Sequence, residues 1–148
     1  MNLFGLFQVS GSALAAERLR AEIVTTNLAN AESTRTPEGG PYRRKVAVFE
    51  SRATTPFQML LAGGMSAAGN QESAGVRVSQ VVEDNSAAVR KYDPGHPDAD
   101  ASGYVEYPDI NPVQEVVDLM GAQRAYELNA SAIAAAKQMI QQSIQILR

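Results

Sequence analysis

The chain of 148 residues contains no cysteine and a single histidine. The missing cysteines exclude disulfide bonds, thiolate metal sites and a cysteine nucleophile. The one histidine, His96, lies in residues 93–97 (DPGHP), a sequence typical of a rigid turn. A Ser-His-Asp hydrolase would depend on this residue, and no second candidate base is placed near a nucleophile. The glycine pair at 39–40 runs into proline and a strand-like stretch, so it does not open a phosphate-binding helix. The sequence therefore predicts no catalytic, cofactor or metal site.

Concentrated positive charge and long apolar runs are also missing. The net charge is −3 and the sequence pI is about 5.1, whereas nucleic-acid binding usually needs a basic face. The one basic cluster, residues 43–45 (RRK), falls in an alternating stretch and predicts a solvated strand face. No apolar run is long enough to cross a bilayer. We therefore expect neither nucleic-acid binding nor membrane insertion.

The first residues lack the features of a cleaved secretion signal. No lysine or arginine precedes Arg18, and Gly5 interrupts the apolar run. A cleaved signal needs a charged start followed by a continuous apolar stretch. This pattern predicts a protein that is cytoplasmic or exported without a cleaved signal.

The N-terminal part of the chain has the spacing of a helix from Ser10 to about Asn30. Apolar and small residues recur at steps of three and four along two adjoining stripes. The first stripe holds Val9, Ser12, Ala16, Leu19, Ile23, Thr26 and Asn30, and the second Leu14, Ala21, Val24, Leu28 and Ala31. The apolar face is therefore wide and needs to be covered.

The C-terminal part predicts a longer helix that begins at Asn111-Pro112, where asparagine can cap and proline suits the first turn. A stripe close to a heptad seam runs to the last residues and is interrupted only by Gln123 and Lys137. Its members are Val116, Leu119, Gln123, Tyr126, Ala130, Ile133, Lys137, Ile140, Ile144 and Leu147. A helix of over thirty residues is about 50 Å long, too long to be covered in a small globule. It must protrude or assemble.

The sequence between the helices changes to the pattern of strands. Residues 42–49 and 76–82 alternate or cluster β-branched side chains, and 104–107 forms a further short strand after a turn at Gly103. The predicted organisation is an N-terminal axial helix (1–34), a β-rich insert (35–110) with a mobile loop (53–74), and a C-terminal axial helix (111–148). The fold class is mainly α with a small β-rich insert.

Residues 98–109 (DADASGYVEYPD) place acidic side chains at the offsets of an EF-hand calcium loop. The last ligand would be Asp109 instead of a bidentate glutamate, and the flanking prolines disfavour the helices that hold such a loop. A turn with Gly103 in the left-handed conformation is the favoured interpretation.

Two wide apolar helices that the insert cannot cover are expected to pair as a coiled-coil-like bundle and to pack against other copies. A contact that does not close into a ring generates a helical array, so we predict a tubular rod. The predicted assembly interface consists of Leu14, Leu19, Ile23, Asn27, Leu28, Asn30, Val116, Leu119, Tyr126, Ile133, Ile140, Ile144 and Leu147.

Two asparagines near the end of the first helix need a separate explanation, because asparagine is a poor helix former. Asn30 can end the helix. Asn27, one turn earlier, is predicted to offer its amide to a neighbouring chain and fix the register of the seam. A local cap without an intermolecular role is the alternative.

The sequence SGSALAAERLRAEIVTTNLANAEST (residues 10–34) resembles the N-terminal signature of the flagellar rod and hook proteins. The blocks PEGGPYRRKVAVFE, YDPGHPDADASGYVEYPDIN and DLMGAQRAYELNASAIAAAKQMI are similar to the proximal-rod members of that family. The blocks cover most of the chain, and residues 53–74 are covered least.

The resemblance implies a structural protein that passes unfolded through the flagellar type III export apparatus. It implies a place in the rod that crosses the periplasm, where the subunit transmits torque. The implied partners are other rod proteins, proximal and distal, the export-gate adaptor at the rod base, and its own copies in a helical assembly. The main alternative is another tubular component of a type III secretion system or a different rod or hook protein. An exported effector or enzyme, or a membrane-active amphipathic module, is less favoured.

Overall fold

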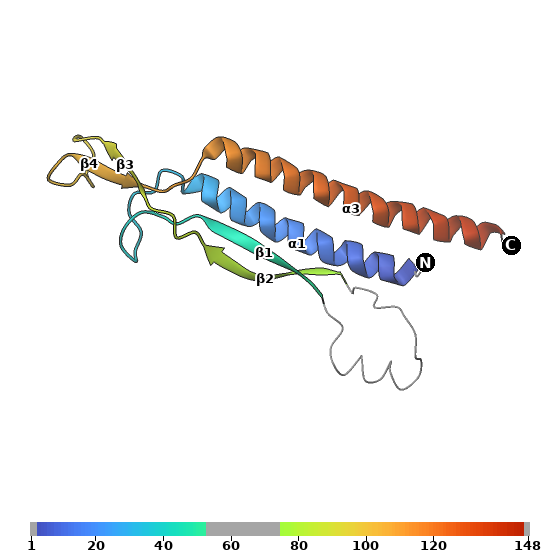
Figure 1. The fold of residues 1–148 in the computed structure, drawn as a ribbon. Coiled ribbons are helices and arrows are strands. Elements are labelled where there is room, and N and C mark those ends of the chain that lie inside the picture. Colours follow the sequence, from blue (N-terminus) through green and yellow to red (C-terminus); the bar gives the residue numbers. More distant parts are fainter. Residues whose placement is uncertain (1–2, 53–74, 147–148) are drawn as a thin grey trace, which may run out of the picture.

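The computed structural model describes residues 3–52 and 75–146, and this part of the chain is elongated (Figure 1). Two long helices lie beside two small two-stranded sheets, so the expectation of a mainly helical protein with a small β-rich insert is confirmed. In chain order the elements are α1 (Leu3–Ala29), β1 (Lys45–Ser51), β2 (Val76–Glu83), β3 (Val89–Tyr92), β4 (Tyr104–Tyr107) and α3 (Pro112–Ile146). The predicted loop at 53–74 lies outside the described residues.

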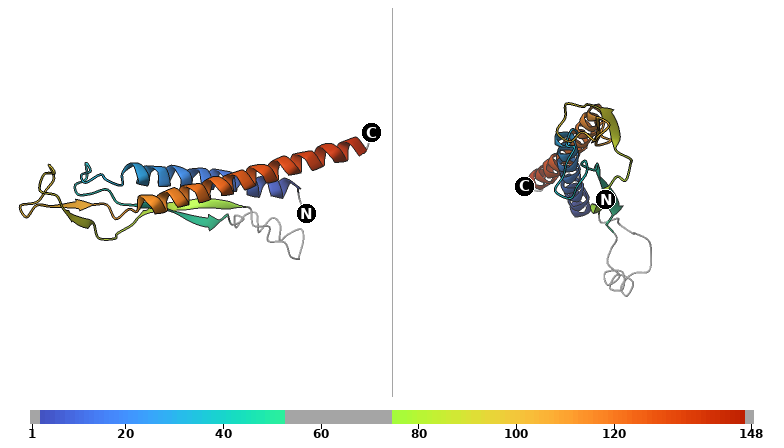
Figure 2. Two further views of the ribbon diagram at one scale, coloured as in Figure 1. Left: turned by 90° about the horizontal axis from the view of Figure 1, so that it is seen from above. Right: turned by 90° about the vertical axis from the view of Figure 1, so that its left-hand side faces the viewer.

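The helix α1 lies between α3 and the β1–β2 hairpin (Figure 1). The two helices run antiparallel, and the C-terminal end of α3 projects beyond the start of α1 (Figure 2). Among the described elements, α3 packs against α1 alone, whereas α1 also packs against β1 and β2. The wide apolar face predicted for the first helix is therefore covered from two sides within one subunit.

The predicted start of the second helix is confirmed at Asn111. The Asn111 Oδ1 accepts hydrogen bonds from the backbone N–H groups of Val113 (3.0 Å) and Gln114 (3.4 Å), and Pro112 occupies the first turn. The first helix begins at Leu3, earlier than the predicted Ser10. Packing along α3 outweighs the low helix propensity of the glycines in this stretch.

The strands β1 and β2 pair antiparallel along α1. The register shifts between Val48 and Phe49, where Ser79 is the extra residue of a β-bulge, and its hydroxyl donates to the Val48 carbonyl (3.2 Å). The hairpin begins at Lys45 and not at Tyr42, because Lys45 is the first residue to pair with β2.

The strands β3 and β4 form a second antiparallel pair, far from the start of α1 and the end of α3 (Figure 1). The strand β4 and the left-handed Gly103 (φ +80°) were both predicted and are confirmed. The strand β3 was missed, because all four of its side chains are exposed and give no alternating pattern.

Candidate assembly interface

The seam between α1 and α3 is built from small side chains. On α3, the buried residues Glu115, Ala122 and Ala136 and the half-buried Asn129 follow one another at intervals of seven. We call this set the inner face of α3. On α1, the buried apolar residues are Ala16 and Val24. Small side chains allow the two helix backbones to approach closely, and Ala136 is 0% exposed.

The heptad positions predicted for α3 are therefore partly wrong, since four of the ten are displaced by one residue from the inner face. The predicted positions Val116, Gln123, Ala130 and Lys137 are all exposed, and their preceding neighbours form the inner face. This displacement explains why Gln123 and Lys137 seemed to interrupt the seam: both lie on the solvent side. Of the other predicted positions, Leu119, Ile133 and Ile140 are half-buried, whereas Tyr126 and Ile144 are exposed.

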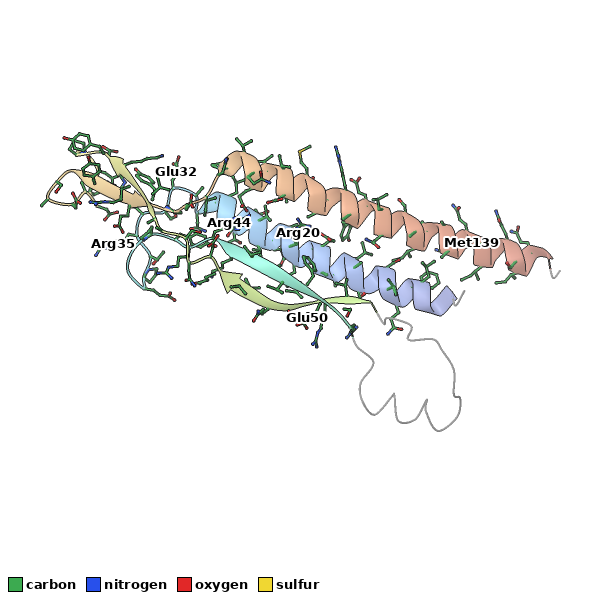
Figure 3. All side chains as sticks on the ribbon, viewed as in Figure 1. Arg20, Glu32, Arg35, Arg44, Glu50 and Met139 are labelled. Atoms are coloured by element: carbon green, nitrogen blue, oxygen red, sulfur yellow. The ribbon has the colours of Figure 1, made fainter. Side chains whose placement is uncertain are left out.

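A second stripe of α3, turned away from α1, is largely apolar and exposed. Side chains project freely from α3 on this side (Figure 3). Steps of three and four residues join its members: Val113, Val117, Met120, Arg124, Leu128, Ser131, Ala135 and Met139. We call this set the outer stripe, in which only Arg124 and Ser131 are polar. Leu128 is 72% exposed and Val117 is 55% exposed. A regular row of exposed large apolar residues is the usual mark of a surface that binds protein.

The structure places the thirteen predicted interface residues in different environments. Asn27 is buried. Leu14, Ile23, Leu28, Asn30, Leu119, Ile133 and Ile140 are half-buried, and Leu19, Val116, Tyr126 and Ile144 are exposed. Leu147 lies outside the described residues. The exposed and half-buried members remain candidates for contact with another chain.

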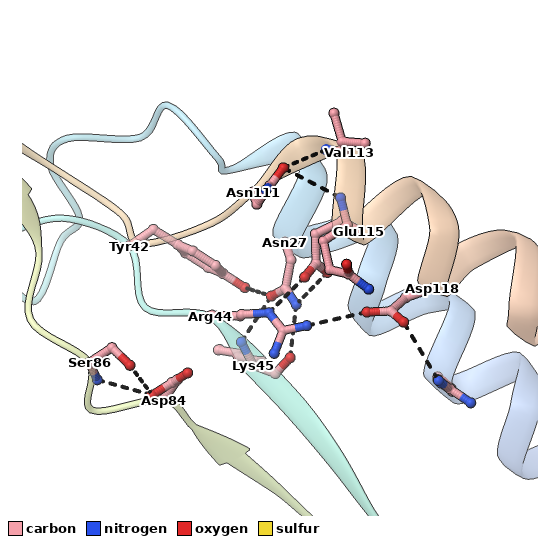
Figure 4. Close-up of polar contacts among 12 residues, drawn as sticks. Asn27, Tyr42, Arg44, Lys45, Asp84, Ser86, Asn111, Val113, Glu115 and Asp118 are labelled. Carbon is pink, nitrogen blue, oxygen red and sulfur yellow. Dashed lines mark hydrogen bonds and ion pairs between the residues drawn. The ribbon is translucent and has the colours of Figure 1, made fainter.

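The Asn27 side chain is fully engaged within its own subunit (Figure 4). Its Nδ2 donates to the Lys45 carbonyl (2.8 Å) and to Glu115 Oε2 (3.1 Å). Its Oδ1 accepts from the Lys45 N–H (2.9 Å) and from the Tyr42 hydroxyl (3.1 Å). Because the amide pairs with both backbone groups of Lys45, it acts as a strand residue would and attaches β1 to α1.

This geometry corrects the hypothesis that Asn27 offers its amide to a neighbouring chain. Both donors and both acceptor positions of the amide are used, and the residue is 0% exposed. Asn30 does lie where α1 ends, and its Nδ2 donates to the Thr26 carbonyl (2.9 Å). Ser33 in turn donates its hydroxyl to Asn30 Oδ1 (3.0 Å). These bonds satisfy polar groups at the helix end.

Glu115 is the one fully buried charged side chain among the described residues. Its Oε1 accepts a hydrogen bond from Arg44 Nε (2.6 Å), and Arg44 also reaches Asp118 (3.5 Å). Arg20 of α1 lies 4.0 Å from the other oxygen of Asp118. The pairing with Arg44 offsets the cost of removing the Glu115 carboxylate from water.

The position of Arg44 corrects a second expectation, since residues 43–45 were predicted to form a solvated strand face. Arg43 and Lys45 do have partners on the strand face: Arg43 donates a hydrogen bond to Asn85 (3.0 Å), and Lys45 forms an ion pair with Glu83 (3.7 Å). Arg44 instead points into the junction of α1 and α3 (Figure 4). The sequence could not reveal this, because its partner is distant in the chain.

Tyr42 completes this junction. Burial of its phenol raises its pKa above the ordinary value of 10.0, and the negative charges of Glu83 and Glu115 add to the shift. The neutral hydroxyl is therefore maintained as a hydrogen-bond donor to Asn27.

A second attachment between α1 and the hairpin was missed in the sequence. The Ser12 hydroxyl accepts from the Val76 N–H (3.0 Å) and donates to the Val9 carbonyl (2.7 Å). Gly75, immediately before β2, has φ +104°, and a Cβ at this position would collide with the Ser12 hydroxyl. Ser12 and Asn27 thus hold β2 and β1 at two points of α1 that are fifteen residues apart.

The turn at residues 93–104 uses its acidic side chains internally. Asp100 Oδ1 accepts from the N–H groups of Ser102 (2.7 Å) and Tyr104 (2.9 Å), and Oδ2 pairs with Arg90 (2.6 Å). These contacts, led by the Tyr104 N–H, lower the pKa of Asp100. Asp98 accepts from the Thr34 hydroxyl (2.8 Å), and His96 Nδ1 accepts from the Asp98 N–H (3.1 Å). Each carboxylate therefore has its own partners, as in the structural turn favoured above.

An open groove of about 550 Å³ lies between residues 39–44 and the second sheet. Three arginines line it, and all are paired: Arg44 with Glu115, Arg43 with Asn85, and Arg90 with Asp100. Among the described residues, no helix has the combination of length and apolar character needed to span a bilayer. The candidate functional surface is therefore not this groove but the outer stripe of α3, the helix that the polar junction joins to α1.

Comparison with known proteins agrees with an assembly role. The family model described as "Flagellar basal body rod FlgEFG protein C-terminal" matches residues 101–146, which include all of β4 and α3. For this part of the chain, the match points to the class of structural proteins of the flagellar basal-body rod.

Full-length relatives identify the family within this class. The chain is 40% identical to flagellar basal-body rod protein FlgC of Borreliella burgdorferi, over 100% of the chain and 99% of the relative. It is 41% identical to FlgC of Bacillus subtilis, over 99% of each, and 38% identical to FlgC of Salmonella typhimurium, over 95% of the chain and 94% of the relative. The chain therefore belongs to the FlgC family of flagellar basal-body rod proteins. As a member it is a structural component of the rod and not an enzyme.

Proposed function

We propose that the chain is a proximal rod subunit that assembles into a tube and transmits torque across the periplasm. One observation supports this most strongly: the outer stripe of α3 is long, regular, largely apolar and exposed in the single subunit. A helix about 50 Å long that is covered along one side can gain further burial from neighbouring subunits.

The antiparallel α1–α3 pair supplies the axial part of the proposed subunit, and pairing in the manner of a coiled coil is part of the proposal. The short seam residues bring α1 and α3 close together, and the larger residues of α3 remain available for other chains. Neighbours would be further copies, other proximal and distal rod proteins, and the adaptor at the rod base. Delivery through the flagellar type III export apparatus, without a cleaved signal, belongs to the same proposal.

Replacement of Leu128 by aspartate tests the outer stripe. Leu128 is 72% exposed in the subunit, so Leu128→Asp should change the free energy of unfolding of the isolated chain by less than about 1 kcal/mol. A charge buried between subunits would instead cost several kcal/mol per copy. In cells that lack the native copy, we expect the variant to be exported but to build no rod.

The measurements are swimming, immunoblots of exported protein and electron microscopy of basal bodies. Gln123→Asp is the matched control, because Gln123 is also exposed on α3 but lies outside the outer stripe; these cells should swim. Leu19→Asp and Ile140→Asp extend the test to predicted interface positions on both helices, and they should be exported without building rods. His96→Ala should swim normally. Normal rods with Leu128→Asp would overturn the proposal.

A further inference from the structure

The polar junction around Asn27 and Glu115 has a property that the α1–α3 seam lacks, namely a unique position along the helix axis. The inner face of α3 repeats every seven residues, with Ala122 and Ala136 separated by Asn129. If α3 moved along α1 by seven residues, about 10 Å, small side chains would again face α1. Packing of small residues therefore selects the register weakly.

The remaining contacts of α3 do not supply a strong alternative constraint. Among the described elements, α3 packs only against α1, and β3 and β4 pack against neither helix. The second sheet, which precedes α3 in the chain, is linked to the segment after α1 by Asp98, which accepts a hydrogen bond from Thr34 (2.8 Å) and pairs with the exposed Arg35 (3.7 Å). Contacts of partly exposed side chains contribute little, so they constrain the axial position of α3 less than a buried charge does. Among the described residues, the hydrogen bonds and ion pairs that link α3 to distant parts of the chain are those of Glu115 and Asp118.

Glu115 can be buried in one place only. In the observed register its carboxylate meets the Asn27 amide at 3.1 Å and the Arg44 guanidinium at 2.6 Å. In a register shifted by seven residues, Ala122 would take its place, and the buried Asn27 donor would lose its acceptor. Buried polar groups without partners are costly, so every shifted register is disfavoured.

We propose that Asn27, Arg44 and Glu115 are positioning residues that select one axial register of α3 on α1. The junction joins three separate segments: α1, the entry to β1, and the first turn of α3 (Figure 4). It therefore determines the axial position of the outer stripe relative to the β1–β2 hairpin. That consequence for the rod rests on the proposed function, whereas the register is a property of the isolated subunit and can be measured there.

The test replaces the ionic part of the junction by apolar residues of similar size, in the double variant Arg44→Met, Glu115→Met, and keeps Asn27, whose amide also holds both backbone groups of Lys45. Apolar replacement of a complete buried ionic group commonly preserves the fold. Since the chain has no cysteine, spin labels can be attached at Thr25→Cys on α1 and Gln138→Cys on α3, both exposed positions outside the junction. Pulsed electron resonance then reports the distribution of distances between the helices.

The parent should give one narrow distance. The double variant should retain the helix content of the parent by circular dichroism but show an added population in which α3 has moved by about 10 Å along the axis of α1. The control Arg18→Met with Glu22→Met removes a pair of exposed charges on α1 (3.0 Å apart) and should keep the single distance. A single parental distance in the double variant, loss of its helix content, or a broadened distribution in the control would each overturn the proposal. None of these measurements depends on rod assembly.

Discussion

The two long helices of this subunit have different surroundings. Among the described elements, α1 is packed by α3 on one side and by the β1–β2 hairpin on another, whereas α3 is packed by α1 alone. Among the side chains that the structure describes, eight exposed large apolar residues lie on α3 and two on α1. The helices differ much less in length, with 35 and 27 residues. The difference shows that α1 is mainly an internal element of the subunit, and that α3 keeps an exposed apolar surface that its own subunit does not cover.

The largest expected effect compares two adjacent alanines of α3. Ala136 is 0% exposed on the inner face, and Ala135 is exposed on the outer stripe. Ala136→Asp buries a charge without a partner and should lower the free energy of unfolding by about 3–5 kcal/mol. Ala135→Asp has the same helix-propensity cost but leaves its carboxylate in water, so it should lower the free energy of unfolding by less than about 1 kcal/mol.

Urea unfolding of the two isolated chains provides this measurement. The two residues are adjacent in the same helix and carry the same substitution. Equal losses of stability would show that α3 has no inner and outer side in the subunit, and the contrast between the two helices would fail.

The second largest effect concerns the junction at which the helices meet. Arg44→Met should leave Glu115 buried without its cation and lower the free energy of unfolding by about 2–3 kcal/mol, less than for a fully buried pair because Arg44 is 28% exposed. Arg18→Met breaks an exposed pair with Glu22 and should cost less than about 0.5 kcal/mol. Thermal unfolding at neutral pH distinguishes them, and equal costs would contradict the structural role of the junction.

Local features of the fold were predictable from the sequence. The helix start at Asn111 and the turn at Gly103 depend on residues within a few positions of each other. The end of α1 at Ala29, just before Asn30, is local in the same way. In each case the residue type and its immediate neighbours determine the backbone.

Features that depend on distant partners were not predictable. Asn27 meets Lys45 and Glu115, which are 18 and 88 positions away, so its role could not be read from α1. The heptad seam of α3 failed for another reason. Apolar residues recur with helical spacing on both faces of α3. Several of the large ones are exposed, whereas the face that meets α1 includes small residues such as Ala122. Periodicity alone cannot tell which stripe meets α1.

The third prediction sharpens the contrast on the other side of α1, where the hairpin is attached. Gly75→Ala introduces a Cβ that collides with the Ser12 hydroxyl and imposes a side chain at φ +104°. Gly39→Ala imposes a similar backbone strain at φ +90°, with nothing within 4 Å of the new Cβ. We expect a loss of about 2–3 kcal/mol for Gly75→Ala and about 1 kcal/mol for Gly39→Ala.

The difference between these glycine variants measures how closely β2 approaches α1. Urea unfolding gives both free energies, and amide exchange of Val76 reports whether the bond to Ser12 is lost. If the two variants were equally stable, the close approach would contribute nothing beyond backbone strain, and α1 would be less enclosed than the fold indicates.

The smallest expected effect is a pH dependence at the α1 side of the junction. Burial, followed by Glu83 and Glu115, raises the pKa of Tyr42 above 10.0 in the folded chain. The unfolded chain therefore releases this proton at lower pH than the folded chain, so the stability contributed by the neutral phenol is complete below about pH 10 and is lost as the pH rises through the folded pKa.

Tyr42→Phe removes the titrating group along with the hydrogen bond to Asn27 (3.1 Å), which should cost about 1 kcal/mol at neutral pH. Between about pH 9 and 11 the parent should then lose stability more steeply than the variant, and the gap between their free energies of unfolding should narrow. The other four tyrosines are present in both proteins, so the difference in slope isolates Tyr42. Parallel slopes over this range would mean that the phenol is no more enclosed in the folded chain than in the unfolded one, and that the junction is open to water on the side of α1.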